Sequence, residues 1–213
     1  MKSDKSIKYK ENTIKFFNQM AHKSHGDSFK HYNNVLKWLK ELTINEKYTL
    51  LDLGTGKGDL LVKILNNISI KNKSWNLIGL DISPEMIKKA LEKKLPVNLN
   101  VGDSESLPYK NLSIDIITCI NSFHHYSNPE KSIYEINRVL KSEGILILGE
   151  IWLPPIFRNL INLFLPYMKT GDYKIYSCKD IIKLFSQQGI ILVEKKYVFP
   201  SNYTYLLKKA EVK

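Results

Sequence analysis

The string DLGTGKG, residues 52–58, puts an acidic residue and three glycines into one short turn. An apolar run at 48–53 leads into it, and an apolar pattern of helical period follows from residue 59. Glycines at every second position let a ligand approach the backbone closely, because no Cβ stands in the way. The string is therefore either a tight strand-to-helix turn or a ligand-binding loop, and taken alone it does not separate the two.

The spacing of the glycines disfavours phosphate as the ligand. A dinucleotide-binding loop reads GxGxxG; Gly54 and Gly56 fit, but the third position is Asp59, which would repel a pyrophosphate. A phosphate loop of the GxxxxGK[ST] type does not occur. S-adenosylmethionine, a nucleoside with a sulfonium and an amino-acid tail but no phosphate, fits the spacing, and Asp52 can accept hydrogen bonds from its amino group.

Polar residues also end the next three predicted strands. Asp81 ends the run 76–81 and can accept hydrogen bonds from both ribose hydroxyls. Asp103 follows the run 97–101 and can accept a hydrogen bond from the adenine amino group. Asn121 ends the run 114–121. Carboxyl ends of parallel strands share one edge, where open α/β sheets bind ligands. The predicted cofactor-binding residues are Asp52, Gly54, Thr55, Gly56, Gly58, Asp81, Ile82, Met86, Asp103, Ser104, Asn121 and Ser122.

The elements that must position these residues form an alternating pattern. Strand-like runs at 48–53, 76–81, 97–101, 114–121, 144–150, 190–198 and 203–209 alternate with helical stretches at 59–68, 84–94, 129–140 and 178–188. This order predicts an α/β fold with a mostly parallel sheet. The last two runs are too close for a crossover helix and should form an antiparallel hairpin.

The flanking segments are predicted to cover this domain. Residues 1–47 form an N-terminal helical cap, with helices at 11–22 and 28–42 and a frayed start over 1–10. Residues 48–213 form the cofactor-binding domain, in which 152–176 is an inserted lid.

The strings LLDLGTGKGDLL and LIGLDISPEMIKKA, with the segment 101–150, resemble the class I S-adenosylmethionine-dependent methyltransferases. The similarity is to the type 11 group, which includes quinone-biosynthesis and other small-molecule methyltransferases, and it covers 48–150 and, in pattern, 178–210. It implies a Rossmann-like seven-stranded sheet with helices on both faces and a terminal antiparallel hairpin. It also implies S-adenosylmethionine as the cofactor, ribose binding by Asp81, and Asn121 beneath the methionine moiety.

A catalytic base is needed only if the methyl acceptor must lose a proton. His124 and His125 lie just past the fourth strand and are candidates for that base, although they could instead pack within their loop. Glu150, at the end of the fifth strand, could line the acceptor pocket. Three further side chains could reach the site if the N-terminal helices cover it: His22, His25 and Tyr32.

The acceptor is predicted to be a small apolar or aromatic molecule, because 11–42 and 152–176 are rich in Phe, Tyr, Leu and Met. The apolar face of 156–168 has three interpretations: packing on the domain, lining a lipophilic pocket, or resting as a peripheral contact on a membrane surface. The competing functions are an RNA or protein methyltransferase and a non-catalytic cofactor-binding protein. The oligomeric state is left open.

The composition bears on the partners. Thirty of the 32 basic residues are scattered lysines, so the net charge of +11 favours a solvated basic surface over a nucleic-acid partner. Cys119 and Cys178 have no metal-binding or disulfide-framework spacing, which favours a reducing cytoplasm and predicts no metal. No apolar run is long enough to predict a spanning helix.

Overall fold

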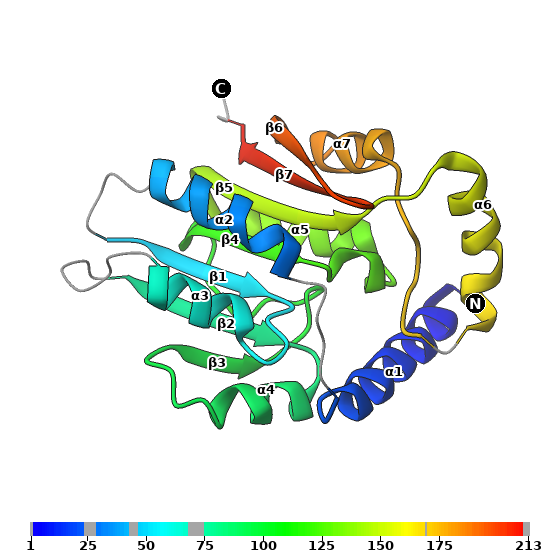
Figure 1. Cartoon of the computed structure of the whole chain (residues 1–213), viewed down its shortest axis with the longest axis horizontal. Helices are drawn as coiled ribbons and strands as arrows, with labels where there is room; N and C mark the ends of the chain where they lie inside the picture. The colour runs from blue at the N-terminus through cyan, green and yellow to red at the C-terminus, as the bar shows by residue number, and fades with distance from the viewer. Residues whose placement is uncertain (1, 24–28, 43–46, 68–74, 169, 211–213) are drawn as a thin grey trace.

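Seven strands form one sheet in the computed structural model, which describes residues 2–23, 29–42, 47–67, 75–168 and 170–210 (Figure 1). The strand order is β3-β2-β1-β4-β5-β7-β6. Strand β7 runs opposite to the other six strands, pairs antiparallel with both β5 and β6, and forms a hairpin with β6. The strands are β1 (Thr49–Leu53), β2 (Asn76–Asp81), β3 (Asn98–Val101), β4 (Ile114–Ile120), β5 (Leu140–Ile151), β6 (Ile190–Val198) and β7 (Asn202–Lys209). The predicted fold class is confirmed.

Helices cover both faces of the sheet. The α-helices are α1 (Lys2–Met20), α2 (Phe29–Leu42), α3 (Asp59–Asn67), α4 (Pro84–Leu91), α5 (Pro129–Val139), α6 (Pro155–Phe164) and α7 (Cys178–Ser186). Two 3₁₀ turns are η2 (Phe123–His125) and η3 (Leu165–Tyr167). Side chains of α2 and α3 share one core with one face of the sheet, and those of α5 and α7 share a second core with the other face.

Successive side chains along the central strands enter the two cores in turn. Leu50 and Ile116 point into the core under α2 and α3, whereas Leu51 and Ile117 point into the core under α5 and α7. Successive side chains of a strand point to opposite faces, so a strand buried on both sides is mostly apolar along its length. The central strands are therefore rigid supports, and their carboxyl ends hold the loops that carry the polar residues.

The two N-terminal helices take different places. The side chains of Val35, Trp38 and Leu39 are buried in the sheet core, so α2 belongs to the layer that covers the sheet. Helix α1 instead crosses the edge toward which β1, β2 and β3 point (Figure 1). The predicted division of the chain at residue 47 stays a prediction.

Two predicted boundaries were wrong. Helix α1 begins at Lys2 rather than near residue 11, because its first turns are held by contacts with distant segments. Strand β5 begins at Leu140 rather than at 144: Leu140 pairs with Ile114, and Glu143 adopts a φ of 65° that turns the chain within the strand.

Candidate active site

The β1–α3 loop depends on its glycines for its shape. Gly54, Gly56 and Gly58 all have positive φ, at 74°, 53° and 74°. A Cβ on Gly54 would lie 2.0 Å from Ser122 Oγ, so this position also requires the missing side chain for close packing. A Cβ on Gly56 would meet nothing within 4 Å, because Gly56 borders the pocket at this edge of the sheet.

Asp81 ties the loop to the end of β2. Its Oδ2 accepts the N–H of Gly56 at 2.8 Å, and its Oδ1 accepts the N–H of Ser83 at 2.9 Å. Burial raises the pKa of this carboxyl, and the backbone N–H groups of Ser83 and Gly56 oppose the rise. The carboxylate keeps lone pairs that face the pocket, and these can accept the ribose hydroxyls of a nucleoside.

Asp52 holds the loop from beneath. Hydroxyls of Thr55 and Thr118 donate to its two oxygens at 2.7 and 2.8 Å. Burial raises the pKa of Asp52 to about 6, against the effect of these two hydrogen bonds. Asp52 borders the pocket, but its oxygens already serve to fix the loop to β4.

The end of β3 is covered by α1. Lys10 Nζ donates to Asp103 Oδ2 at 2.6 Å and lies 3.1 Å from Glu105 Oε2. The Ser104 hydroxyl is 2.9 Å from the hydroxyl of Ser132, so it is turned toward α5. Asp103 and Ser104 both border the pocket, and α1 forms the wall opposite them.

Asn121 offers a polar acceptor to the pocket. It follows β4 with a φ of 50°, and its backbone N–H donates to Gly149 O at 2.7 Å. Its side-chain Oδ1 is buried and has no hydrogen bond of ordinary geometry among the residues that the structure describes, although the His31 ring lies close enough to interact with the Asn121 side chain. Buried polar atoms are normally satisfied. Together with the open space at Gly56, this acceptor fits the amino-acid end of S-adenosylmethionine.

The structure brings the predicted cofactor residues together around one pocket, with one exception. Gly58 does not border the pocket: a Cβ there would lie 3.5 Å from Ala90 and 3.6 Å from Leu95, so this glycine closes the turn against α4. Residues that sequence reasoning did not assign also line the pocket, among them Lys10, Thr13 and Phe17 of α1, and Tyr126. The apolar pattern of 11–22 had signalled Phe17 as helical, but nothing in the sequence linked Lys10 to Asp103.

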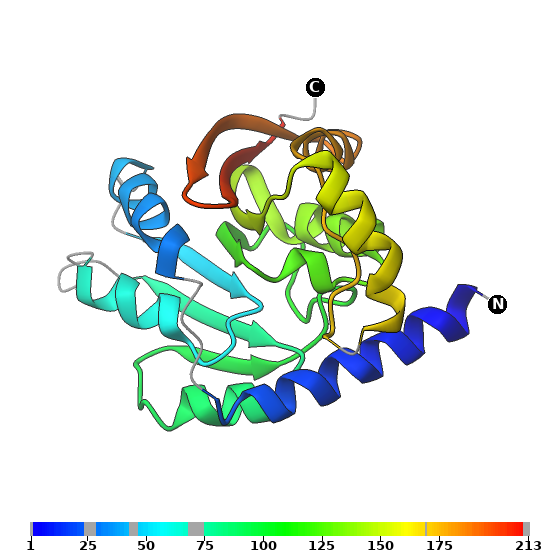
Figure 2. The ribbon, with the colours of Figure 1, turned by 45° about the vertical axis from the view of Figure 1, so that its right-hand side comes forward.

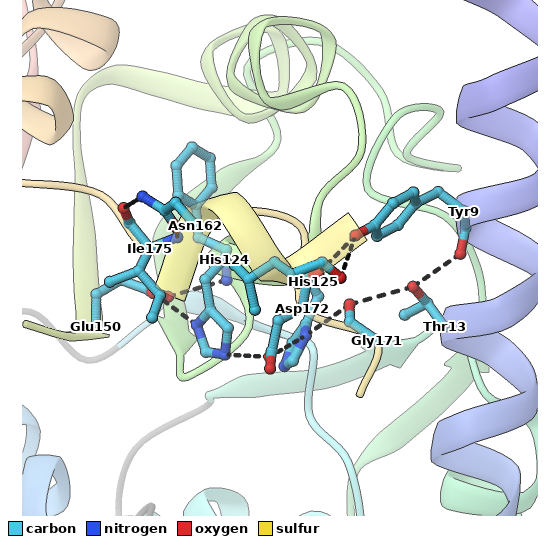
Figure 3. A network of polar contacts seen from close by, with 11 residues as sticks. Tyr9, Thr13, His124, His125, Glu150, Asn162, Gly171, Asp172 and Ile175 are labelled. Carbon is cyan, nitrogen blue, oxygen red and sulfur yellow. Dashed lines mark hydrogen bonds and ion pairs between the residues drawn. The ribbon is translucent and has the colours of Figure 1, made fainter. Parts of the chain in front are cut away.

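The two histidines of η2 have different surroundings (Figure 3). His124 does not border the pocket; its Nδ1 lies 2.7 Å from Glu150 Oε2, and its Nε2 lies 3.5 Å from Asp172 Oδ1. His125 borders the pocket, and its Nδ1 donates to Gly171 O at 3.0 Å. Glu150 was expected to line the acceptor pocket, but it instead accepts the N–H of Phe123 and holds His124.

The electrostatics of the pair differ accordingly. Burial alone would lower the pKa of His124, but Glu150 and Asp172 outweigh burial and raise it. Burial and the neighbouring His124 cation hold the pKa of His125 well below its ordinary value. His124 therefore lies between two carboxylates that favour its protonated form, whereas His125 is neutral with a lone pair on Nε2.

The remaining candidates lie apart. Tyr32 is buried and lines the pocket, whereas His22 is exposed and lies 3.7 Å from Glu85. His25 lies outside the described residues.

A possible metal centre coincides with this cluster. Among the described residues, one group, His124, His125 and Asp172, offers three ligand atoms within 4.8 Å of one another. Both ring nitrogens of His124 already face carboxylates, so a proton on His124 satisfies the cluster. That the chain uses no metal stays a prediction.

The comparison with known families agrees with this geometry. A family model described as a methyltransferase domain matches residues 44–189. The chain belongs to this family. Membership confirms the resemblance to class I methyltransferases, the enzyme class and S-adenosylmethionine as the cofactor.

Two relatives illustrate the range of the family. The chain is 37% identical over 147 residues to an uncharacterised methyltransferase of Schizosaccharomyces pombe, covering 68% of this chain and 53% of that protein. It is 29% identical over 190 residues to a demethylmenaquinone methyltransferase of Thermotoga maritima, covering 79% of each. The chain thus spans about half the length of the fission-yeast relative.

The fold also matches solved structures. A chain from the complex between the Trm112 methyltransferase activator of Haloferax volcanii and a methyltransferase superposes with a TM-score of 0.77 at 19% identity, covering 94% of this chain and 99% of that one. At this identity the similarity concerns the fold alone.

Proposed function

We propose that this chain transfers the methyl group of S-adenosylmethionine to a small apolar or aromatic acceptor, and that His125 contacts that acceptor. The observation that carries the proposal is the position of His125. Its ring borders the pocket beyond the glycine loop and stands edge-on to Phe17, with ring centroids 4.8 Å apart.

Aromatic side chains supply the rest of the wall on this side. Phe17 of α1, Tyr32 of α2 and Tyr126 after η2 all line the pocket. Pockets for small molecules combine such apolar walls with a few placed polar groups. The Thermotoga maritima relative, named for a quinone acceptor, supports an acceptor of the same character.

The chemistry assigned to His125 is acceptor orientation and proton removal. Bound S-adenosylmethionine supplies a methyl group on a sulfonium, which leaves as a neutral thioether and needs no acid. Since Nδ1 of His125 donates to Gly171 O, its Nε2 can accept a hydrogen bond from a hydroxyl of the acceptor. Burial and His124 disfavour the imidazolium that forms when the proton is taken, and Asp172 Oδ1, 3.2 Å from Nδ1, opposes that effect.

The decisive experiment is transfer of an isotopically labelled methyl group in extract of the source cells, followed by identification of the labelled product. We expect the label in a small organic-extractable molecule. Label in RNA or protein would instead support the competing methyltransferase hypotheses, and cofactor binding without any transfer would support a non-catalytic role.

His125→Asn tests the assigned residue on the identified acceptor. For an acceptor that loses a proton, kcat should fall by roughly 10²–10⁴-fold while the affinity for S-adenosylmethionine is kept. His22→Asn, at a histidine whose side chain is 60% exposed, is the matched control and should leave kcat unchanged. Full activity of His125→Asn would show that His125 packs in the pocket wall without taking part in methyl transfer.

A further inference from the structure

Helix α6 has its apolar side turned to solvent. None of its side chains is buried, and Ile156, Phe157 and Leu163 are 80%, 61% and 65% exposed. A helix on a globular protein normally turns its apolar stripe toward the core. The α6 face, as defined here, consists of Ile156, Phe157, Leu160, Leu163 and Phe164 with the following Tyr167 and Met168, all largely exposed.

The inward side of the same helix is more polar and is anchored. Asn162 donates to Ile175 O and accepts from Ile175 N–H, both at 2.9 Å. Arg158, Ile161 and Asn162 are half-buried, and they alternate along the helix with the exposed residues. Of the three interpretations of the 156–168 face, packing on the domain therefore holds for Leu165, which is buried, but not for the exposed residues of α6, because the hydrogen bonds of Asn162 fix the opposite side of the helix against the protein.

The surroundings of the α6 face are basic. Residues 151–171 hold two basic residues and no acidic one. Helix α1 lies beside the C-terminal end of α6, where the Tyr9 hydroxyl donates to Leu165 O (Figure 2). Its sequence has five lysines and two acidic residues; Lys10 is paired with Asp103 and Glu105, which leaves four other lysines in the helix. The nearby carboxylate of Asp172 points inward to the histidine pair and does not offset this charge.

We propose that the α6 face binds the surface of an anionic lipid bilayer. Its side chains would enter the boundary between headgroups and acyl chains, while basic residues of α1 lie near lipid phosphates. No helix among the described residues is long and apolar enough to cross a membrane. At ten residues, or about 15 Å, α6 suits an orientation in the plane of the interface.

Charge complementarity selects this occupant over a second copy of the chain. Two copies joined through their α6 faces would bring two lysine-rich α1 helices toward each other, whereas anionic headgroups attract them. The proposal goes beyond the methyl acceptor. Vesicle binding is read without turnover, so it can fail or succeed independently of the proposed function.

The test is co-sedimentation of the full chain with vesicles of phosphatidylcholine alone and of phosphatidylcholine with about one quarter phosphatidylglycerol. We expect binding to the anionic vesicles, weakened several-fold when salt is raised from about 0.05 to 0.5 M. The double variant Phe157→Gln/Leu160→Gln should bind about tenfold less, because two apolar side chains no longer enter the interface. Melting temperature should stay unchanged, since both side chains are exposed.

Leu91→Gln is the matched control, because Leu91 is 57% exposed at the end of α4 and Leu160 is 54% exposed in α6. It should bind vesicles as the unaltered chain does. Absence of vesicle binding, equal binding to neutral vesicles, or equal binding by the double variant would each overturn the proposal. Self-association in solution that the double variant abolishes would overturn it in favour of an interface between copies.

Discussion

One hydrogen bond, from the N–H of Gly56 to Asp81 Oδ2, joins the loop that follows β1 to the carboxylate that ends β2. Because Gly56 has no side chain and Asp81 is held by two backbone N–H groups, both present fixed polar groups to the pocket. Such preorganisation reduces what a ligand must order on binding. Asp81 is therefore the residue whose charge we expect to matter most for the nucleoside.

Asp81→Asn should weaken binding of S-adenosylmethionine by about tenfold or more, because two charge-assisted hydrogen bonds to the ribose are lost. Titration calorimetry on the purified chain measures this. Asp115→Asn is the control, since Asp115 also accepts a backbone N–H, that of Thr49, but at the opposite edge of the sheet. Equal loss of affinity in the two variants would show a general effect on folding.

The buried carboxyl of Asp52 predicts a pH dependence of stability. Its pKa is raised to about 6, so the folded chain gives up this proton between about pH 5 and 7, whereas the unfolded chain has lost it already near pH 4. Stability should therefore fall as pH rises, by about 1 kcal/mol over this range from Asp52 alone. Urea denaturation of the unaltered chain and of Asp52→Asn at both pH values isolates the contribution, and parallel pH profiles would contradict it.

Helix α1 covers the cofactor pocket and is held there by polar contacts at two places. Lys10 reaches Asp103 and Glu105 at one end of the pocket. Tyr9 and Thr13 donate to the carbonyls of Asp172 and Gly171, the segment that also contacts the histidines (Figure 3). The position of α1 thus depends on a few polar contacts with parts of the chain far away in sequence.

Lys10→Gln should loosen α1. A partly buried ion pair contributes about 1 kcal/mol, so amide hydrogen exchange in α1 should become roughly fivefold faster. Lys8→Gln changes an exposed lysine of the same helix and should leave exchange unaltered. Equal rates of amide hydrogen exchange in α1 of the two variants would show that Lys10 does not hold the helix in place.

At the scale of the whole molecule, a cluster of buried aromatic rings fixes the position of η2 on the domain. Phe123 is fully buried and packs against Tyr126, Tyr176 and Phe185 with ring centroids 5.5, 5.3 and 5.2 Å away. These rings come from η2 and its end, from the segment before α7, and from α7 itself. The histidines next to Phe123 are therefore placed by the same core that holds α7 against the sheet.

Phe123→Ala should lower the free energy of unfolding by about 3–5 kcal/mol, because a large buried ring leaves a cavity. Thermal or urea denaturation followed by circular dichroism measures the loss. Phe199→Ala removes a ring that is 81% exposed and should change stability by no more than about 0.5 kcal/mol. A similar small effect at Phe123 would mean that the core repacks around η2.

The cofactor side of the site could be predicted from sequence because its causes are local. An apolar run predicts a buried strand, and the residue that follows the run lies at the carboxyl edge of the sheet. This placement does not depend on contacts with distant parts of the chain. Asp81, Asp103 and Asn121 were placed in this way. The hairpin of β6 and β7 followed from the shortness of their connection.

The contacts of α1 and those of the acceptor side could not be predicted, because they join residues that no local pattern relates. Lys10 meets Asp103, and His124 meets Glu150 and Asp172, across long stretches of chain. The pattern FHH does not say which histidine borders the pocket; the carboxylates of β5 and of the insertion decide it. The apolar stripe of α6 can be recognised in the sequence. The sequence alone does not say where the stripe faces, because the same pattern suits packing, lining a pocket or binding a surface. The hydrogen bonds of Asn162 in the folded chain direct it toward solvent.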